Sequence, residues 1–184
     1  MELMQAIKER RSIRRYTSTP VSEEDLMTVL EAARWAPSWS NTQCWRFIVV
    51  RDHQIKETIA QALPQENVAV QAIREAPLVI VVCAKLGRSG YIRREKATDK
   101  GGYWFMFDVA LAMENLVLAA HSLGLGTVHV GWFDAEKVAE ILEVPEGMAV
   151  VEMTPLGHRD ERPRPPGRKE LSEIVFYDRY GGSN

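Results

Sequence analysis

Cysteine is scarce in this sequence, because its 184 residues include only Cys44 and Cys83. The two residues form neither a CxxC pair nor a spacing typical of metal ligands, so no disulfide scaffold and no metal site are predicted. Free cysteines are typical of a reducing compartment, and we therefore expect a cytoplasmic protein.

An excess of charge of one sign is also missing, since 23 Lys and Arg residues stand against 25 Asp and Glu residues, a net charge of −2. Proteins that bind nucleic acid generally carry a basic excess, so we expect no nucleic-acid partner. Apolar residues make up 46% of the chain and charged residues 26%, which excludes a mainly disordered protein. The length predicts one domain, residues 1–184.

Long hydrophobic runs are absent as well. The longest run, Pro77 to Ala84, is about a third of a membrane span. The apolar stretch from Phe105 to Leu125 is interrupted by Asp108, Glu114 and His121. The N-terminal segment is charged from its second residue and has no apolar core, so no signal peptide is predicted. We expect no membrane partner.

Helical and strand patterns alternate along the chain. Apolar residues at helical spacing predict helices, and continuous apolar runs predict strands that are buried on both faces. The fold class is therefore α+β, with three layers and a mixed central sheet flanked by helices. The helices are expected at residues 1–11, 22–33, 55–63, 104–123 and 134–142, and the strands at residues 46–50, 78–84, 127–131 and 148–156.

The C-terminal segment is rich in proline. Residues 162–168 must be extended, because proline supplies no backbone donor and resists helix formation. The apolar group at residues 171–177 then needs a surface to cover. We expect residues 162–184 to form an arm that packs on a second subunit.

A dense basic segment, Arg10 to Arg15, contains four arginines and Ser12. Guanidinium groups bind phosphate through paired hydrogen bonds, so the segment favours an anion site. The alternative is a solvated basic turn whose charges are balanced by Glu23, Glu24 and Asp25.

A second unusual segment, Ala36 to Trp45, places tryptophans, amides and hydroxyls in a loop before a predicted strand. Such groups are costly to bury unless they meet partners, and amides can read the edge of a flat heterocycle. The alternative is an ordinary turn with Trp45 in the core.

Several familiar motifs are missing. Gly124-Leu125-Gly126 follows a helix and has His129 in the third glycine position, so it is no dinucleotide fingerprint. The sequence also has no phosphate loop and no Gly-x-Ser-x-Gly nucleophile elbow. The four histidines are scattered and form no metal motif.

The remaining motifs occur in a particular order. Arg-Arg-Ser-x-Arg at residues 10–14 precedes Ala-Pro-Ser-x-x-Asn-x-Gln-x-Trp at residues 36–45, Leu-Gly-Leu-Gly-Thr at residues 123–127 and a proline-rich stretch with Arg168. From about Ile7 to Gly181, the chain resembles the FMN-dependent nitroreductase family. The resemblance implies a homodimer with FMN at the interface and C-terminal arms exchanged between subunits. It also implies NAD(P)H as electron donor, a ping-pong mechanism and two-electron delivery to nitroaromatic, quinone or similar acceptors.

The resemblance also assigns site residues, while the flavin itself would carry the redox chemistry and no catalytic side chain is predicted. The ribityl phosphate and the pyrimidine edge would be held by Arg10, Arg11, Ser12, Arg14 and Arg168. The flavin ring would meet Pro37, Ser38, Asn41 and Gln43, with Gln43 from the partner subunit. Backbone amides near flavin N5 and O4 would come from Val130, Gly131 and Trp132.

The substrate rim is expected at Lys85 to Gly102, a basic stretch that includes Arg93 and Arg94. It would attract the phosphate of NADPH or an anionic acceptor, or else it is a mobile solvated loop. Trp39 would narrow the substrate pocket. Cys44 stands where the family usually has proline, as a buried filler or as a redox-active thiol.

Three alternatives remain open. The same fold also hosts reductive dehalogenation and flavin fragmentation by oxygen. A protein that stores or senses FMN without turnover would keep its colour when NAD(P)H is added. An RNA-binding domain built on the basic segments would be colourless, and its binding would collapse with salt.

Overall fold

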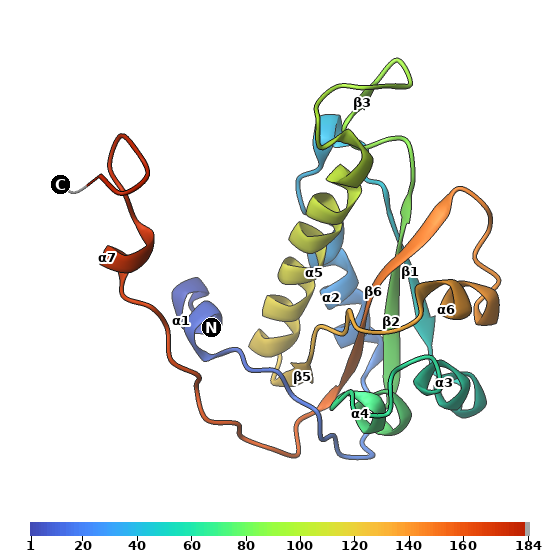
Figure 1. Cartoon of the computed structure of the whole chain (residues 1–184). Coiled ribbons are helices and arrows are strands. Elements are labelled where there is room, and N and C mark those ends of the chain that lie inside the picture. The colour runs from blue at the N-terminus through green and yellow to red at the C-terminus, as the bar shows by residue number, and fades with distance from the viewer. Residues whose placement is uncertain (183–184) are drawn as a thin grey trace.

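A four-stranded antiparallel sheet with strand order β1-β2-β6-β5 forms the centre of the computed structural model, which describes residues 1–182 (Figure 1). The inner strand β2 is buried along nearly its whole length, as the prediction of a strand covered on both faces requires. The four strands are β1 (Trp45–Val50), β2 (Leu78–Lys85), β5 (Leu125–Thr127) and β6 (Met148–His158).

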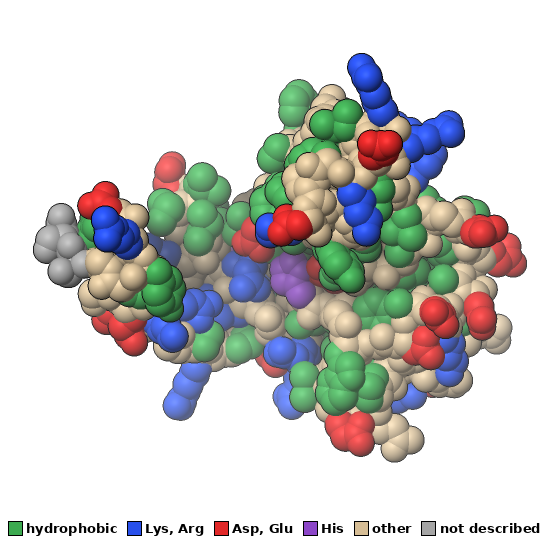
Figure 2. Space-filling model, turned by 45° about the horizontal axis from the view of Figure 1, so that its top comes forward, with side chains coloured by type: hydrophobic (Ala, Val, Ile, Leu, Met, Phe, Trp, Pro, Cys, Tyr) green, Lys and Arg blue, Asp and Glu red, His purple; other side chains and the backbone are tan. Residues whose placement is uncertain are grey.

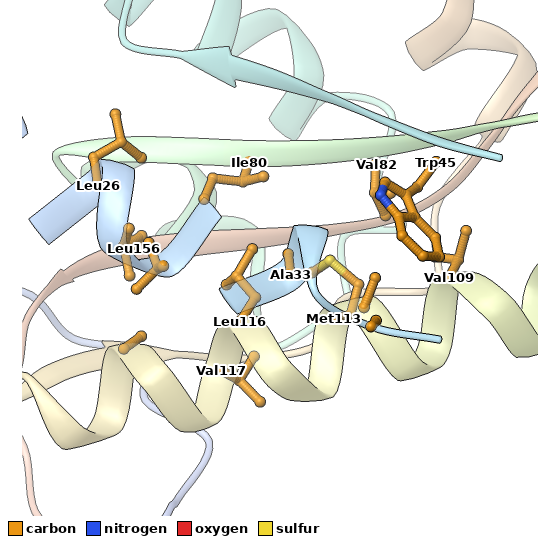
Figure 3. Close-up of a cluster of buried hydrophobic side chains, with 14 of the residues drawn as sticks. Leu26, Ala33, Trp45, Ile80, Val82, Val109, Met113, Leu116, Val117 and Leu156 are labelled. Carbon is orange, nitrogen blue, oxygen red and sulfur yellow. The ribbon is translucent and has the colours of Figure 1, made fainter. Parts of the chain in front are cut away.

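Helices cover both faces of the sheet, so the prediction of a three-layer α+β fold is confirmed (Figure 1). On one face lie α2 (Glu23–Arg34) and α5 (Trp104–Ser122), and on the other lie α3 (His53–Ala60), α4 (Val70–Glu75) and α6 (Ala135–Ile141). Apolar side chains of α2 and α5 meet those of the sheet in a closely packed core (Figure 3). The buried side chains labelled there include Leu26, Ala33, Ile80, Val82, Val109, Met113, Leu116 and Leu156.

The strand predictions need three corrections. Every ladder of the sheet is antiparallel, and the one parallel pairing in the described chain is the isolated bridge between Ser12 and Thr127, so the expected mixed sheet is not formed. β5 ends at Thr127 and does not cover residues 127–131, because only Val130 pairs onward, as a single bridge to Met153. The short helix α4 and the hairpin of β3 (Tyr91–Ile92) and β4 (Glu95–Lys96) were not predicted.

The helix that includes α5 is the one segment in the described residues that is long and apolar enough to cross a bilayer, with a mean hydropathy of 1.3 over its best window. Its inward side is packed against α2 and the sheet, where Val109, Met113 and Leu116 are fully buried. A buried carboxylate, Asp108, lies near its N-terminal end. These contacts are those of a core helix.

The chain leaves the body after β6 and runs out to α7 (Leu171–Ile174) (Figure 1). Its proline-rich part is extended, as predicted, and lines cavities with α1 (Leu3–Glu9) and the residues that follow this helix. Apolar side chains of the arm are exposed in the single chain, including Leu171, Ile174, Val175, Phe176 and Tyr177.

Candidate functional site

The basic segment after α1 and the arm form one cavity of about 310 Å³. Its lining includes two parts of the chain that are far apart in sequence, residues 10–14 and residues 163–168. The arm thus brings Arg168 to the arginines at the end of α1. We call this space the cationic cavity; the predicted flavin residues that line it are Arg10, Arg11, Ser12, Arg14 and Arg168.

Two guanidinium nitrogens near the cationic cavity have no protein partner. Nη1 of Arg10 and Nε of Arg14 are buried and make no hydrogen bond within the described chain. A buried donor without an acceptor costs about 1–3 kcal/mol, so native proteins rarely leave one unpaired. Phosphate oxygens are acceptors of the charge and geometry that guanidinium favours, so these residues fit the phosphate of FMN.

Two of the three acidic residues that would have balanced a solvated basic turn make contacts elsewhere. Glu23 pairs with Arg51 at the surface. Asp25 accepts a hydrogen bond from the hydroxyl of Ser22, the N-cap of α2. Glu23 and Asp25 therefore do not balance the charges of Arg10–Arg15, although Glu161 accepts hydrogen bonds from the backbone N–H groups of Arg14 and Arg15.

Arg11 differs from its neighbours, because its guanidinium is already in use. Its Nη1 donates to the carbonyl oxygens of Lys8 and Arg10, each at 2.7 Å. These carbonyls lie at the C-terminal end of α1, where helix carbonyls lack internal partners. Arg11 thus closes the helix as well as lining the cationic cavity.

Loop 36–44, between α2 and β1, carries the second set of predicted flavin residues. Its backbone is unusual, since φ is +43° at Ser40, +54° at Asn41 and +45° at Gln43. Positive φ is uncommon for residues other than glycine and costs on the order of 1 kcal/mol at each position. The loop is braced by its own polar groups: the Ser38 hydroxyl accepts from the Gln43 N–H at 2.9 Å, and the Gln43 amide donates to Asn41 Oδ1 at 3.0 Å.

A buried carboxylate on α5 anchors this loop. Asp108 is 0% exposed and accepts a hydrogen bond from the Trp39 N–H at 3.1 Å. The hydroxyl of Ser89 donates to it at 2.5 Å and that of Thr42 at 3.4 Å. The sequence marked Asp108 only as a charge within an apolar stretch.

The predicted substrate rim folds into a hairpin at this same end of α5. Arg93 and Arg94 form its two-residue turn with φ of +51° and +71°. Turns with two positive φ values favour Asn-Gly, so two arginines here are a strained choice that the turn itself does not require. Lys and Arg side chains gather around the hairpin and, separately, between the arm and the body (Figure 2). A contact of 2.7 Å between the hydroxyls of Thr42 and Ser89 joins the rim to loop 36–44.

The segment predicted to approach flavin N5 follows β5. Val130 is fixed by backbone hydrogen bonds to Met153, while a Cβ added at Gly131 would meet no atom within 4 Å. Trp132 is 61% exposed, and its carbonyl accepts from Asn67 Nδ2 at 2.7 Å. Asn67 therefore positions the open side of this segment. Asn67 was not predicted as a site residue, although Pro64 marks the turn in which it lies.

His129, just before this segment, lies between two carboxylates. Its Nδ1 is 2.5 Å from Glu152, and its Nε2 is 3.7 Å from Glu114 on α5. Hydrogen bonds to Glu114 and Glu152 raise the pKa of His129 to about 9. The imidazolium form therefore predominates at neutral pH and links α5 to β6.

One chain does not bring all the predicted residues together. The cationic cavity lies beyond the C-terminal end of α5, where Ile13 bonds to Thr127, whereas loop 36–44 and the hairpin are tied to Asp108 at the N-terminal end. The 19 residues of α5 span about 28 Å at 1.5 Å per residue. The two sets of predicted flavin residues therefore lie apart in the single chain.

Comparison with known proteins identifies the family. Residues 7–158 match the Nitroreductase family. The chain belongs to the nitroreductase family. It is 34% identical, over 93% of its length and 83% of the relative, to a Methanothermobacter thermautotrophicus protein provisionally named NADH dehydrogenase/NAD(P)H nitroreductase. It is 30% identical to the FMN reductase [NAD(P)H] of Bacillus subtilis, over 88% of this chain and 67% of that one.

The fold agrees with this assignment. The structure of the NADPH:FMN oxidoreductase of Vibrio harveyi in complex with NAD+ superimposes with a TM-score of 0.84 at 29% identity. The superposition covers 99% of this chain and 79% of that one. The expected resemblance to the nitroreductase fold is thus confirmed.

Proposed function

We propose that this nitroreductase-family member is an NAD(P)H-dependent FMN oxidoreductase that acts as a homodimer. The observation that carries the proposal is the cationic cavity, where buried donors of Arg10 and Arg14 find no acceptor among residues 1–182. The FMN reductase of Bacillus subtilis and the oxidoreductase of Vibrio harveyi are named for FMN and a nicotinamide cofactor, which supports the same pair here.

In this proposal, each flavin lies between two chains. One chain supplies the cationic cavity, in which the arginines bind and neutralise the phosphate, together with the backbone of residues 130–132. The other chain supplies Pro37, Ser38, Asn41 and Gln43. The side-chain amides of Asn41 and Gln43 would face the ring. Bound FMN would supply the two-electron redox chemistry that takes electrons from NAD(P)H to a nitroaromatic, quinone or similar acceptor.

The substrate rim would serve donor and acceptor in turn, as a ping-pong mechanism requires. Arg93 and Arg94 place two positive charges at an exposed hairpin tip, where they can attract the phosphate of NADPH or an anionic acceptor. The ring of Trp39, in loop 36–44, packs edge-on against that of Trp104, with 4.8 Å between the ring centroids. We propose that Trp39 limits the size of the pocket from this position.

Exposed apolar side chains support the proposed dimer. Leu3 and Met4 of α1 are 65% and 58% exposed, and the apolar side chains of the arm are exposed in the same way. Covering such surfaces favours association. We propose that residues 1–184 act as one domain and that the arm, residues 162–184, packs on the partner subunit. Cys44 and Cys83 are free and buried, which is in keeping with the proposed reducing cytoplasm.

The visible absorption spectrum of the purified protein, before and after anaerobic addition of NADPH, tests the proposal. We expect flavin bands that bleach on NADPH, return on addition of a quinone, and yield intact FMN on denaturation. Bands that persist would indicate a storage protein, and loss of the flavin itself would indicate fragmentation. A protein that stays colourless and binds no added FMN would refute the flavin proposal.

A further inference from the structure

The contacts of Asp108 join three parts of the chain that the sequence keeps apart. Its carboxylate lies on the first turns of α5 and is fully buried. It accepts hydrogen bonds from Trp39 and Thr42 of loop 36–44, which lie 69 and 66 residues away in sequence, and from Ser89 of the substrate rim. The thiol of Cys44 lies 3.8 Å from Oδ2 of Asp108, the oxygen that also accepts from Thr42 and Ser89.

A buried carboxylate in this setting is stable only while its donors remain in place. Removing a buried charge from water costs several kcal/mol in general unless hydrogen bonds compensate for the loss of hydration. Here the donors come from the loop and the rim and not from α5 itself. The charge on the helix therefore favours one arrangement of both segments.

Loop 36–44 needs such an anchor, because its backbone is strained at Ser40, Asn41 and Gln43. The hydrogen bonds within the loop, from Gln43 to Ser38 and Asn41, travel with it and cannot fix it to the body. Asp108 supplies the external attachment of the loop's first half through the Trp39 N–H. Edge-on packing of Trp39 on Trp104 holds the same segment from the side. The last residue of the loop is held by the Lys85 N–H, which donates to the Cys44 carbonyl at 2.8 Å.

The substrate rim is also attached to Asp108 and to loop 36–44, through residues at the base of its hairpin. A Cβ added at Gly90 would lie only 2.7 Å from the Cα of Gly101, so the segments that enter and leave the hairpin are in close contact there. Ser89, next to Gly90, is 2% exposed and contacts both Asp108 and Thr42. Displacement of Asp108 would therefore loosen loop and rim together.

We infer that Asp108 is a positioning residue that holds the flavin-facing loop 36–44 and the substrate rim in one fixed arrangement. The inference rests on the proposed function for the identity of the ligand. Asp108 is buried beneath both segments and acts on the flavin through Asn41 and Gln43, without touching it. Asp108 does not line the cationic cavity.

The test compares wild type, Asp108→Asn and the control Asn115→Ala. Asn115, on the same helix, donates to the Ala32 carbonyl at 3.2 Å and contacts α2, so its loss removes a side-chain hydrogen bond of α5 away from the site. We expect backbone amides of residues 39–44 and 89–92 to exchange hydrogen about tenfold faster in flavin-free Asp108→Asn than in wild type. We also expect its Kd for FMN to rise about tenfold, whereas Asn115→Ala leaves both quantities unchanged.

The outcomes separate the inference from the proposed function. A folded Asp108→Asn protein with wild-type exchange and wild-type FMN affinity would overturn the inference and leave the proposed function standing. If wild type bound no FMN, the proposed function would fail, and exchange in the flavin-free protein would still decide whether Asp108 holds the loop. If Asp108→Asn did not fold, Ser89→Ala and Thr42→Val would replace it, and wild-type exchange in both would overturn the inference.

Discussion

The two ends of α5 carry opposite arrangements of charge. Beyond the C-terminal end, cationic groups are assembled with buried donors left unpaired at Arg10 and Arg14. At the N-terminal end, the buried anion Asp108 is surrounded by donors from the loop and the rim. The hydrogen bonds that Asp108 accepts tie the loop and the rim to α5, while the unpaired donors of Arg10 and Arg14 indicate a missing ligand. The comparison thus separates the residues that build the site from those that bind.

Loss of the unpaired donors should have the largest effect. In the double variant Arg10→Ala, Arg14→Ala, we expect the Kd for FMN to rise by about 100-fold or more, since two hydrogen bonds to a charged group are lost and each contributes about 1.5–3 kcal/mol. Fluorescence titration of the flavin-free protein measures the change. Wild-type binding should also weaken with salt, and the variant should show less of this dependence.

Arg51→Ala is the matched control, because Arg51 pairs with Glu23 at the surface and lies outside the cationic cavity. It should bind FMN as wild type does. Equal losses in Arg51→Ala and in the double variant would mean that net charge matters and the cavity does not.

Substitutions in the hairpin near the N-terminal end of α5 should have a smaller effect. They should raise the stability of the fold and weaken the use of NADPH. Replacing Arg93 by Asn and Arg94 by Gly suits a turn with two positive φ values. We expect the free energy of unfolding to rise by about 1 kcal/mol, while the KM for NADPH rises about threefold, as for an exposed ion pair. Steady-state kinetics and urea unfolding measure the two quantities.

The KM for NADH serves as the internal reference for this variant. It should change less than the KM for NADPH, because NADH lacks the additional phosphate. Equal changes for both donors would refute a role of the hairpin in phosphate recognition.

The smallest expected effect is on the pH dependence of stability, through His129, which pairs with Glu114 in the middle of α5. Because the folded-state pKa of His129 is raised from 6.5 to about 9, its pairing with Glu114 and Glu152 stabilises the fold fully below pH 6.5. This contribution is lost as the pH rises through about 9. The Tm of wild type should therefore fall over this range, while His129→Gln should show a flatter profile. Identical profiles would contradict the ion pairing.

Much of the fold could be predicted because its signals are local. Helical spacing from Trp104 to Leu123 indicated α5, and a continuous apolar run indicated β2. The pairing direction of the strands could not be predicted, since a strand buried on both faces has the same composition in parallel and antiparallel sheets. The hairpin was missed because Arg93-Arg94 lacks the residues typical of its turn.

The site was predicted only in part, and for a related reason. The order of the motifs predicted that the arginines and loop 36–44 bind the same flavin. The sequence does not show that a helix of about 28 Å separates them in one chain. Asp108 and Asn67 were missed because each acts through partners distant in sequence: Asp108 contacts Trp39, and Asn67 contacts Trp132, 65 residues away. Contacts of this kind become visible only in the folded chain.

Hybrid dimers test most directly whether the two ends of α5 meet across chains. Chains with Arg10→Ala, Arg14→Ala are combined with chains carrying Asn41→Ala, Gln43→Ala, and the hybrids are isolated through two different affinity tags. Each variant homodimer should bind FMN weakly. The hybrid should bind one FMN with wild-type affinity, because one of its two sites then contains only unchanged parts. If both halves of a site came from the same chain, every site in the hybrid would carry a defect, and failure to recover wild-type affinity would contradict the account.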